Sequence, residues 1–152
     1  MVRHSALHGT RAALALVALI SLGSVQRLDA QSLTPSGTPT LRVSTAVAGS
    51  APTSVSVSTT TLAFTIGNGS ALTLQAKLAA ALPAGVTLEV SVTAPSGATS
   101  NGLVTMSTSY ADLTSSIPKN KSGTLTITHR LSATSAAGAI AASSASLSFR
   151  LL

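Results

Sequence analysis

The residues that could carry acid–base or nucleophilic chemistry are few and widely spaced. Beyond position 30 the chain has one histidine, His129, and two carboxylates, Glu89 and Asp112, and it has no cysteine anywhere. A Ser-His-Asp relay would have to use His129 with one of these carboxylates, and no G-x-S-x-G sequence marks a nucleophilic serine. His129 instead continues the alternating apolar positions 125, 127 and 131. We therefore expect it at the end of a core row or on an edge, not as a catalytic base.

Residues that could bind a metal ion are also few. A zinc or calcium site needs several His, Cys, Asp or Glu ligands, and residues 31–152 offer one histidine and two acids. Glu89 lies on the polar side of an alternating stretch, which predicts a solvated charge. The sequence thus predicts no enzyme, no metal site and no cofactor.

One aromatic and two basic residues remain as ligand contacts. Tyr110 is the only tyrosine, and Lys119 and Lys121 follow it in a stretch without clear alternation, residues 110–123. We expect this stretch to be an irregular loop in which Tyr110 packs at the corner between two strands. Because carbohydrate-binding modules present aromatic platforms, the alternative is that Tyr110, Lys119 and Lys121 contact a sugar or peptide there.

The composition replaces charge with hydroxyl groups. Charged residues make up 8% of the 152 residues, against about 25% in an average soluble domain. From residue 31 onward the chain has 22 serines and 20 threonines in 122 residues. The basic residues are scattered and aromatic residues make up 2%, so the stacking partners and basic patch of a nucleic-acid binder are missing.

Residues 1–30 have the layout of a secretory signal peptide. Arg3 and Arg11 precede a largely apolar run of 11 residues, 12–22, and a small residue, Ala30, precedes a polar stretch. Eleven helical residues rise about 16 Å, roughly half a bilayer core, so we expect no transmembrane span. Cleavage after Ala30 would leave a net charge of +4. An uncleaved, membrane-anchoring N-terminus is the alternative.

The elements that position these residues read as short strands. Apolar residues alternate with hydroxyl residues, as in residues 86–92, and turn residues recur about every ten positions. Apolar residues take odd positions in 54–58 and even positions in 62–66, so a bulge, a bend or a change of sheet is predicted between them. Leu147, Phe149 and Leu151 form a last apolar row, which predicts a C-terminal strand docked on the core.

This pattern predicts an all-β protein with one antiparallel, Ig-like β-sandwich of seven to nine short strands. Residues 31–40 contain two prolines and a glycine, so we expect a flexible N-terminal arm there. The sandwich domain would then comprise residues 41–152, following the signal peptide in residues 1–30.

The stretches PAGVTLEVSVTAPSG, YADLTSSI and SLSFRLL resemble bacterial exported Ig-like sandwiches, including chaperone–usher pilin subunits and spore-coat-U-like secreted proteins. The cysteine pair common in those pilins is missing here, so no functional residue is transferred. The resemblance implies a secreted, periplasmic or cell-surface structural protein, such as a pilus-like or coat-like subunit or an adhesion module. Its edge strands would pair with further copies or with other surface proteins. The alternative is a soluble carbohydrate- or peptide-binding module outside the cytoplasm.

Overall fold

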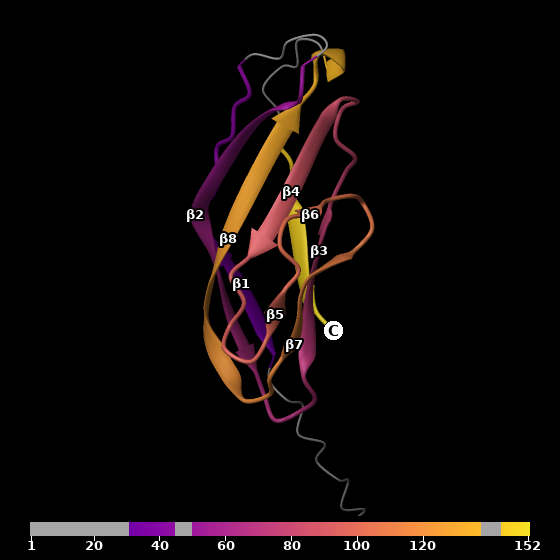
Figure 1. Cartoon of the computed structure of the whole chain (residues 1–152). Helices are drawn as coiled ribbons and strands as arrows, with labels where there is room; N and C mark the ends of the chain where they lie inside the picture. The colour runs from indigo at the N-terminus through magenta and orange to yellow at the C-terminus, as the bar shows by residue number, and fades with distance from the viewer. Residues whose placement is uncertain (1–30, 45–49, 138–143) are drawn as a thin grey trace, which may run out of the picture.

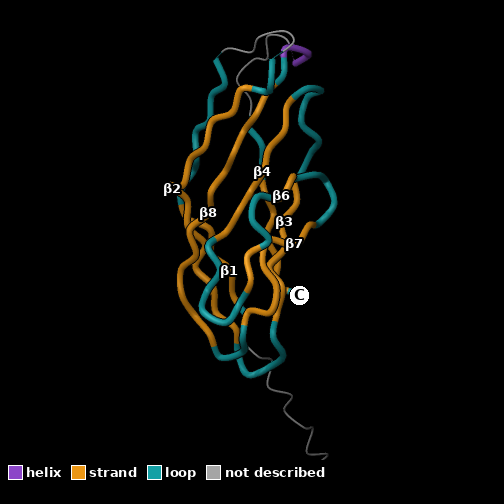
Figure 2. The backbone as a smooth tube through the Cα atoms, in the orientation of Figure 1, coloured by secondary structure: helices purple, strands orange, loops and turns teal. Residues whose placement is uncertain are grey.

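The protein is a sandwich of two antiparallel sheets, as the alternating pattern predicts. A computed structural model describes residues 31–44, 50–137 and 144–152; the expected signal peptide in residues 1–30 lies outside this part. The described residues form nine strands and one short 3-10 helix, so the all-β prediction is confirmed. Figure 2 shows that strands make up most of the trace and that the helix lies at one end.

One sheet has five strands, in the order β1-β2-β8-β4-β6, and the other has four, in the order β5-β7-β3-β9. Every strand pair in both sheets is antiparallel. Figure 1 shows the strands of both layers along the long axis of the molecule, with β9 in yellow beside β3. The strands are β1 (Ser32–Ser36), β2 (Thr53–Ile66), β3 (Leu72–Leu78), β4 (Val86–Val92), β5 (Thr99–Ser100), β6 (Val104–Thr105), β7 (Ala111–Ile117), β8 (Lys121–Ala133) and β9 (Leu147–Leu151).

The core lies between the two sheets and is built from the apolar rows that the sequence alternation defines. In β4, for example, Leu88, Val90 and Val92 are buried while Thr87 is exposed. Apolar burial of this kind contributes roughly 1.5–3 kcal/mol for each fully buried Val or Leu. The buried apolar residues are Leu62, Phe64, Ile66, Leu74, Ala76, Leu78, Leu88, Val90, Val92, Met106, Leu113, Ile117, Leu125 and Ile127.

The change of parity in β2 is a β-bulge, one of the outcomes that the sequence predicts. Val57 pairs with His129 and Thr60 pairs with Ile127, so Ser58 and Thr59 together stand opposite one residue of β8. An extra residue turns the following side chains over. The bulge thus keeps the apolar side chains of both halves of this 14-residue strand on the same face of the sheet, half-buried before the bulge and buried after it.

The expectation of an irregular loop at residues 110–123 is wrong. Most of this stretch is strand β7 followed by the start of β8. The segment of β7 that pairs with Leu72–Ala76 of β3 is two residues longer than that segment of β3. The register therefore shifts at two places. These irregularities bury two consecutive residues, Leu113 and Thr114. They erase the period-two pattern by which a strand is recognised.

The expectation of a flexible arm at residues 31–40 is wrong for Ser32–Ser36. This segment is strand β1, which pairs with residues 61–65 at the edge of the five-stranded sheet. Leu33 packs against the core. Pro35 lacks an N–H, and proline inside a sheet is confined to such edge positions and bulges. A backbone partner in β2 therefore orders a segment whose own composition favours a turn.

Strand β9 docks as the sequence predicts. It pairs with β3 over five residues, and Leu147, Phe149 and Leu151 are half-buried against the core. Because β9 is the last strand of the four-stranded sheet, its other side forms a sheet edge.

Candidate functional site

The three titratable groups that could serve catalysis face three different surfaces of the sandwich. His129 is 5% exposed and faces the core. Glu89 alternates with the buried residues of β4 and therefore faces outward from the five-stranded sheet. Asp112 is exposed on the four-stranded sheet, where its carboxylate accepts a hydrogen bond of 2.5 Å from Gln75. This arrangement brings no two of these groups together around a shared substrate position.

His129 is a core residue supported by the β2 bulge. The Thr60 hydroxyl lies 3.2 Å from His129 Nδ1 and 3.3 Å from the carbonyl oxygen of Ile127, to which it donates. Burial lowers the pKa of His129 below its usual value, because the charged imidazolium loses solvation. Of the two expected positions, an edge is wrong because β8 lies between β2 and β4, and His129 belongs to the core row, which continues to Leu131. Its partner is a threonine that the sequence did not single out.

Glu89 is ion-paired, which differs from the solvated charge that the sequence predicts. Arg130, directly opposite on β8, places Nη2 2.6 Å and Nε 2.7 Å from Glu89 Oε2. The Glu89 and Arg130 side chains are 18% and 38% exposed. The pair is therefore partly buried, and opposite charges directly across two antiparallel strands contribute roughly 0.2–1 kcal/mol.

Tyr110 forms a cluster of polar side chains on the outer face of the four-stranded sheet. Tyr110 immediately precedes β7 in the chain. The guanidinium carbon of Arg150 lies 3.8 Å and Lys77 Nζ lies 4.8 Å from the centroid of its ring. Arg150 Nε also donates to Gln75 Oε1 at 2.7 Å. The cluster joins side chains of β3 and β9 to the residue that precedes β7. A cation over an aromatic face contributes about 0.5–1 kcal/mol at an exposed site.

The structure does not bring the three predicted contact residues together. Strand β7 lies between Tyr110 and Lys119, and seven strand residues span roughly 20 Å. Lys119 and Lys121 flank Asn120, whose backbone N–H donates to Gly67 at the opposite end of the strand. The neighbours of Tyr110 are instead Lys77 and Arg150. Their position on the polar faces of their strands was visible in the sequence, but which strands are adjacent was not.

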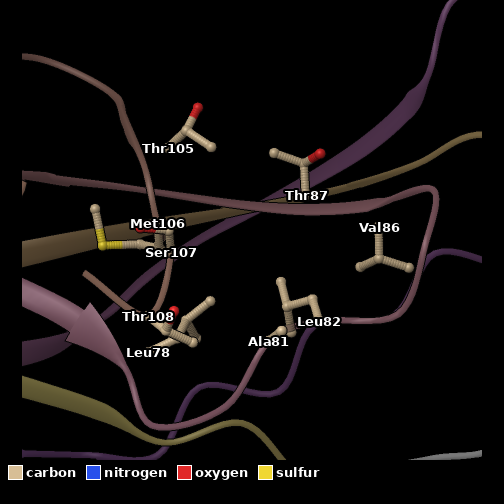
Figure 3. Close-up of a pocket in the computed structure, with 9 residues that line it drawn as sticks. All are labelled: Leu78, Ala81, Leu82, Val86, Thr87, Thr105, Met106, Ser107 and Thr108. Carbon is tan, nitrogen blue, oxygen red and sulfur yellow. The ribbon is translucent and has the colours of Figure 1, made fainter.

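A small hollow opens between the two sheets at the side of β4 and β6. Figure 3 shows its nine lining residues, among which Leu82, Val86 and Met106 supply apolar surface and threonines and a serine supply hydroxyls. Its volume is about 240 Å³, below the roughly 300–1,000 Å³ of ligand pockets. The lining has no titratable side chain, so this hollow has no group that could exchange a proton with a bound molecule.

Strand β9 has backbone hydrogen-bonding groups without a partner among the described residues. Leu152 exchanges hydrogen bonds of 3.0 and 2.8 Å with Thr73, and Ala79 N–H donates to Ser146 at 2.9 Å. In an antiparallel pair, alternate residues point their N–H and C=O toward the partner. The backbone N–H and C=O groups of residues 148 and 150 therefore also point toward β3. The N–H and C=O groups of Leu147, Phe149 and Leu151 point to the opposite side, which is called here the free edge of β9. Strand β1 lies near this side at its Leu151 end, across a small hollow lined by residues 31–33 and Leu151.

The other sheet edges in the described part of the chain are protected in ways typical of natural sheets. Strands β5 and β6 are two residues long, and β1 contains Pro35. Strand β9 is five residues long, has no proline and alternates apolar residues. Among these four edges, β9 is thus the one best able to accept another strand.

Comparison of the chain with protein-family models, with curated proteins and with solved structures found no match. Within residues 31–44, 50–137 and 144–152, no helix is long and apolar enough to cross a bilayer, and no three His, Asp or Glu side chains lie together as metal ligands would. The fold alone therefore defines the class of this protein, an all-β sandwich of two antiparallel sheets.

Proposed function

We propose that this chain is an exported structural or interaction module that joins other protein chains at a sheet edge and has no catalytic activity. The observation that carries the proposal is the free edge of β9, with three residues whose backbone groups point away from β3. An exposed strand edge is a template for strand addition, in which main-chain hydrogen bonds supply affinity.

Export is inferred from residues 1–30, whose basic, apolar and small-residue segments follow the order of a secretory signal. A secreted, periplasmic or cell-surface location fits a chain that presents hydroxyl groups where other proteins present charges. A pilus-like or coat-like subunit or an adhesion module is the role that combines this location with an edge for strand pairing. The resemblance of its short, Ser/Thr-rich strands to those of bacterial exported sandwiches supports the same role.

The proposed absence of catalysis is supported by the separation of His129, Glu89 and Asp112 onto three surfaces. General acid–base catalysis needs its groups within hydrogen-bond reach of one substrate position. His129 is held against Thr60 in the core, and Glu89 is occupied by Arg130.

Fractionation of the source cells tests the proposal. Antibody against the chain should detect it on the cell surface or in the periplasm or medium, lacking residues 1–30, in assemblies larger than a monomer. Gentle extraction followed by size-exclusion chromatography with light scattering measures the assemblies. A chain found only as a cytoplasmic monomer would contradict both export and assembly.

A second candidate function is a binding module for an acidic sugar or an acidic peptide. It is favoured by the cluster of Tyr110, Lys77 and Arg150, because two cations beside one aromatic ring suit an anionic ligand. Binding to an array of neutral and acidic glycans, lost in both Tyr110→Ala and Lys77→Gln, would support it. Lys119→Gln, at the far end of β7, is the matched control and should bind as the wild type does.

A further inference from the structure

We propose that the partner of the free edge of β9 is β9 of a second copy of this chain, paired antiparallel about a two-fold axis at Phe149. This inference rests on the proposed function, since it names the strand that the edge accepts. The paired strands would join two four-stranded sheets into one continuous sheet. The pairing is isologous, so each copy uses the same surface and the assembly closes as a dimer.

The hydrogen-bonding pattern of β9 selects the register. The free N–H and C=O groups belong to Leu147, Phe149 and Leu151. All three residues find partners only when Phe149 stands opposite Phe149 and Leu147 stands opposite Leu151 of the other copy. A shift by two residues in either direction leaves one residue of each β9 without a partner from the other β9.

The side chains favour the same register. On the core side it places Leu147 against Leu151 and the two Phe149 rings against each other, and such apolar and aromatic cross-strand pairs are stabilising. On the outer side it places Ser148 opposite Arg150. A shift toward the C-terminus would instead place Arg150 opposite Arg150, and like charges directly opposite each other are destabilising.

The guanidinium of Arg150 is already drawn away from the free edge. It donates to Gln75 at 2.7 Å and stacks on Tyr110 at 3.8 Å, and both residues lie on the β3 side of β9. The two copies of Arg150 therefore keep their charges apart across the seam. By holding the Arg150 side chain on the β3 side, the cluster around Tyr110 leaves the free edge of β9 accessible for pairing.

The dimer should be weak and sensitive to salt. Strand β9 has five residues, whereas a stable interface uses about 20–30 residues a side. Residues 31–152 also carry a net charge of +4, so two copies repel each other. Salt screens charges over about 10 Å at 0.1 M and 3 Å at 1 M, so association should strengthen as salt is added.

Charge substitutions at Ser148 test the register. Ser148→Glu places a carboxylate opposite Arg150 of the other copy and should strengthen the dimer; Ser148→Lys should weaken it. Each change occurs twice in a dimer, so the dissociation constant should shift by roughly two- to thirtyfold in either direction. Thr126→Glu and Thr126→Lys are matched controls for net charge, because Thr126 is exposed on the five-stranded sheet.

Sedimentation velocity of residues 31–152, from micromolar to millimolar concentration, measures these constants, and thermal melting checks that every variant is folded. The expected order of dimer strength is Ser148→Glu, then wild type, then Ser148→Lys, with both Thr126 variants much closer to the wild type. A monomer at every concentration and salt level, or a dimer that ignores the sign of the charge at 148, would overturn the inference.

A cysteine pair provides a second test, since the chain has no cysteine of its own. Ser148→Cys and Arg150→Cys protein, mixed and oxidised, should form the mixed disulfide in preference to either symmetric one. Position 148 stands opposite 150 of the other copy, whereas neither 148 nor 150 stands opposite itself. Preferential symmetric disulfides would contradict this register. If self-pairing fails in both tests while the chain is still found in larger surface assemblies, the proposed function stands and its partner is another protein.

Discussion

Two buried threonines mark the two irregular strands, and the structure treats them differently. Thr60, beside the bulge in β2, is 4% exposed and its hydroxyl contacts both His129 and the Ile127 carbonyl. Thr114, within the irregular part of β7, is fully buried, and its hydroxyl has no hydrogen-bond partner among the described residues. The same side chain thus completes a polar contact in one sheet and leaves an unpaired group in the other.

The difference shows that a bulge which turns a polar side chain inward does not by itself supply a hydrogen-bond partner for it. In β2 the extra residue directs Thr60 toward a histidine that needs a partner. In β7 the register shifts bury Thr114 beside Leu113 where no acceptor is available in the described structure. An unpaired buried hydroxyl costs about 1–3 kcal/mol in proteins, so β7 carries a local cost that β2 avoids.

Deleting Thr59 should have the largest effect, because it removes the extra residue of the β2 bulge. Val55 and Val57 would then face solvent, or the strand would have to slip against β8. We expect a loss of about 3 kcal/mol in the free energy of unfolding, from the two half-buried valines and the disturbed register. Urea denaturation measures it. Deletion of Gly69, exposed in the turn between β2 and β3, is the control, and equal losses in both would mean that the bulge has no special role.

Thr60→Val should destabilise the fold by about 1–3 kcal/mol. The substitution removes the hydroxyl that serves Ile127 and His129 and leaves their buried polar atoms without it. Thr60→Ser, which keeps the hydroxyl, should recover most of this loss. Denaturant midpoints of the three proteins provide the measurement; a valine variant as stable as the wild type would show that the contact contributes nothing.

Thr114→Val should have the opposite sign and raise the free energy of unfolding by about 1 kcal/mol. Valine has nearly the same shape and removes a buried hydroxyl that has no partner in the described residues. The melting temperature should rise by a few degrees. A lower melting temperature would show that the hydroxyl of Thr114 is hydrogen-bonded in solution, for example to a buried water.

The pH dependence of stability should show the smallest effect. Burial lowers the pKa of His129 in the folded state below the 6.5 of the exposed side chain. As the pH falls below 6.5, the unfolded chain binds a proton that the folded chain does not, so stability decreases until the lowered folded pKa is reached. Above this window the histidine contributes no slope. Denaturation of residues 31–152 at pH 8, 6 and 5 measures the effect, and the slope should vanish in His129→Gln.

The fold could be predicted from the sequence wherever the alternation is regular. Strands β4, β8 and β9 follow directly from their apolar rows, and the change of parity between residues 54–58 and 62–66 located the bulge in β2. Strand β7 was missed because its register shifts bury adjacent residues, so its sequence carries no period of two. Strand β1 was missed because its order comes from pairing with β2 and not from its own composition.

The sequence by itself determined the class of structure, since the period-two arrangement of valine, leucine and threonine permits burial of one face of each strand and solvation of the other. It also determined how few groups are available for chemistry. Only the tertiary structure decided which strands are neighbours, because pairing between distant segments depends on the whole sheet. That decision separated Tyr110 from Lys119 and Lys121, placed Tyr110 beside Lys77 and Arg150, and left the backbone of β9 facing away from β3.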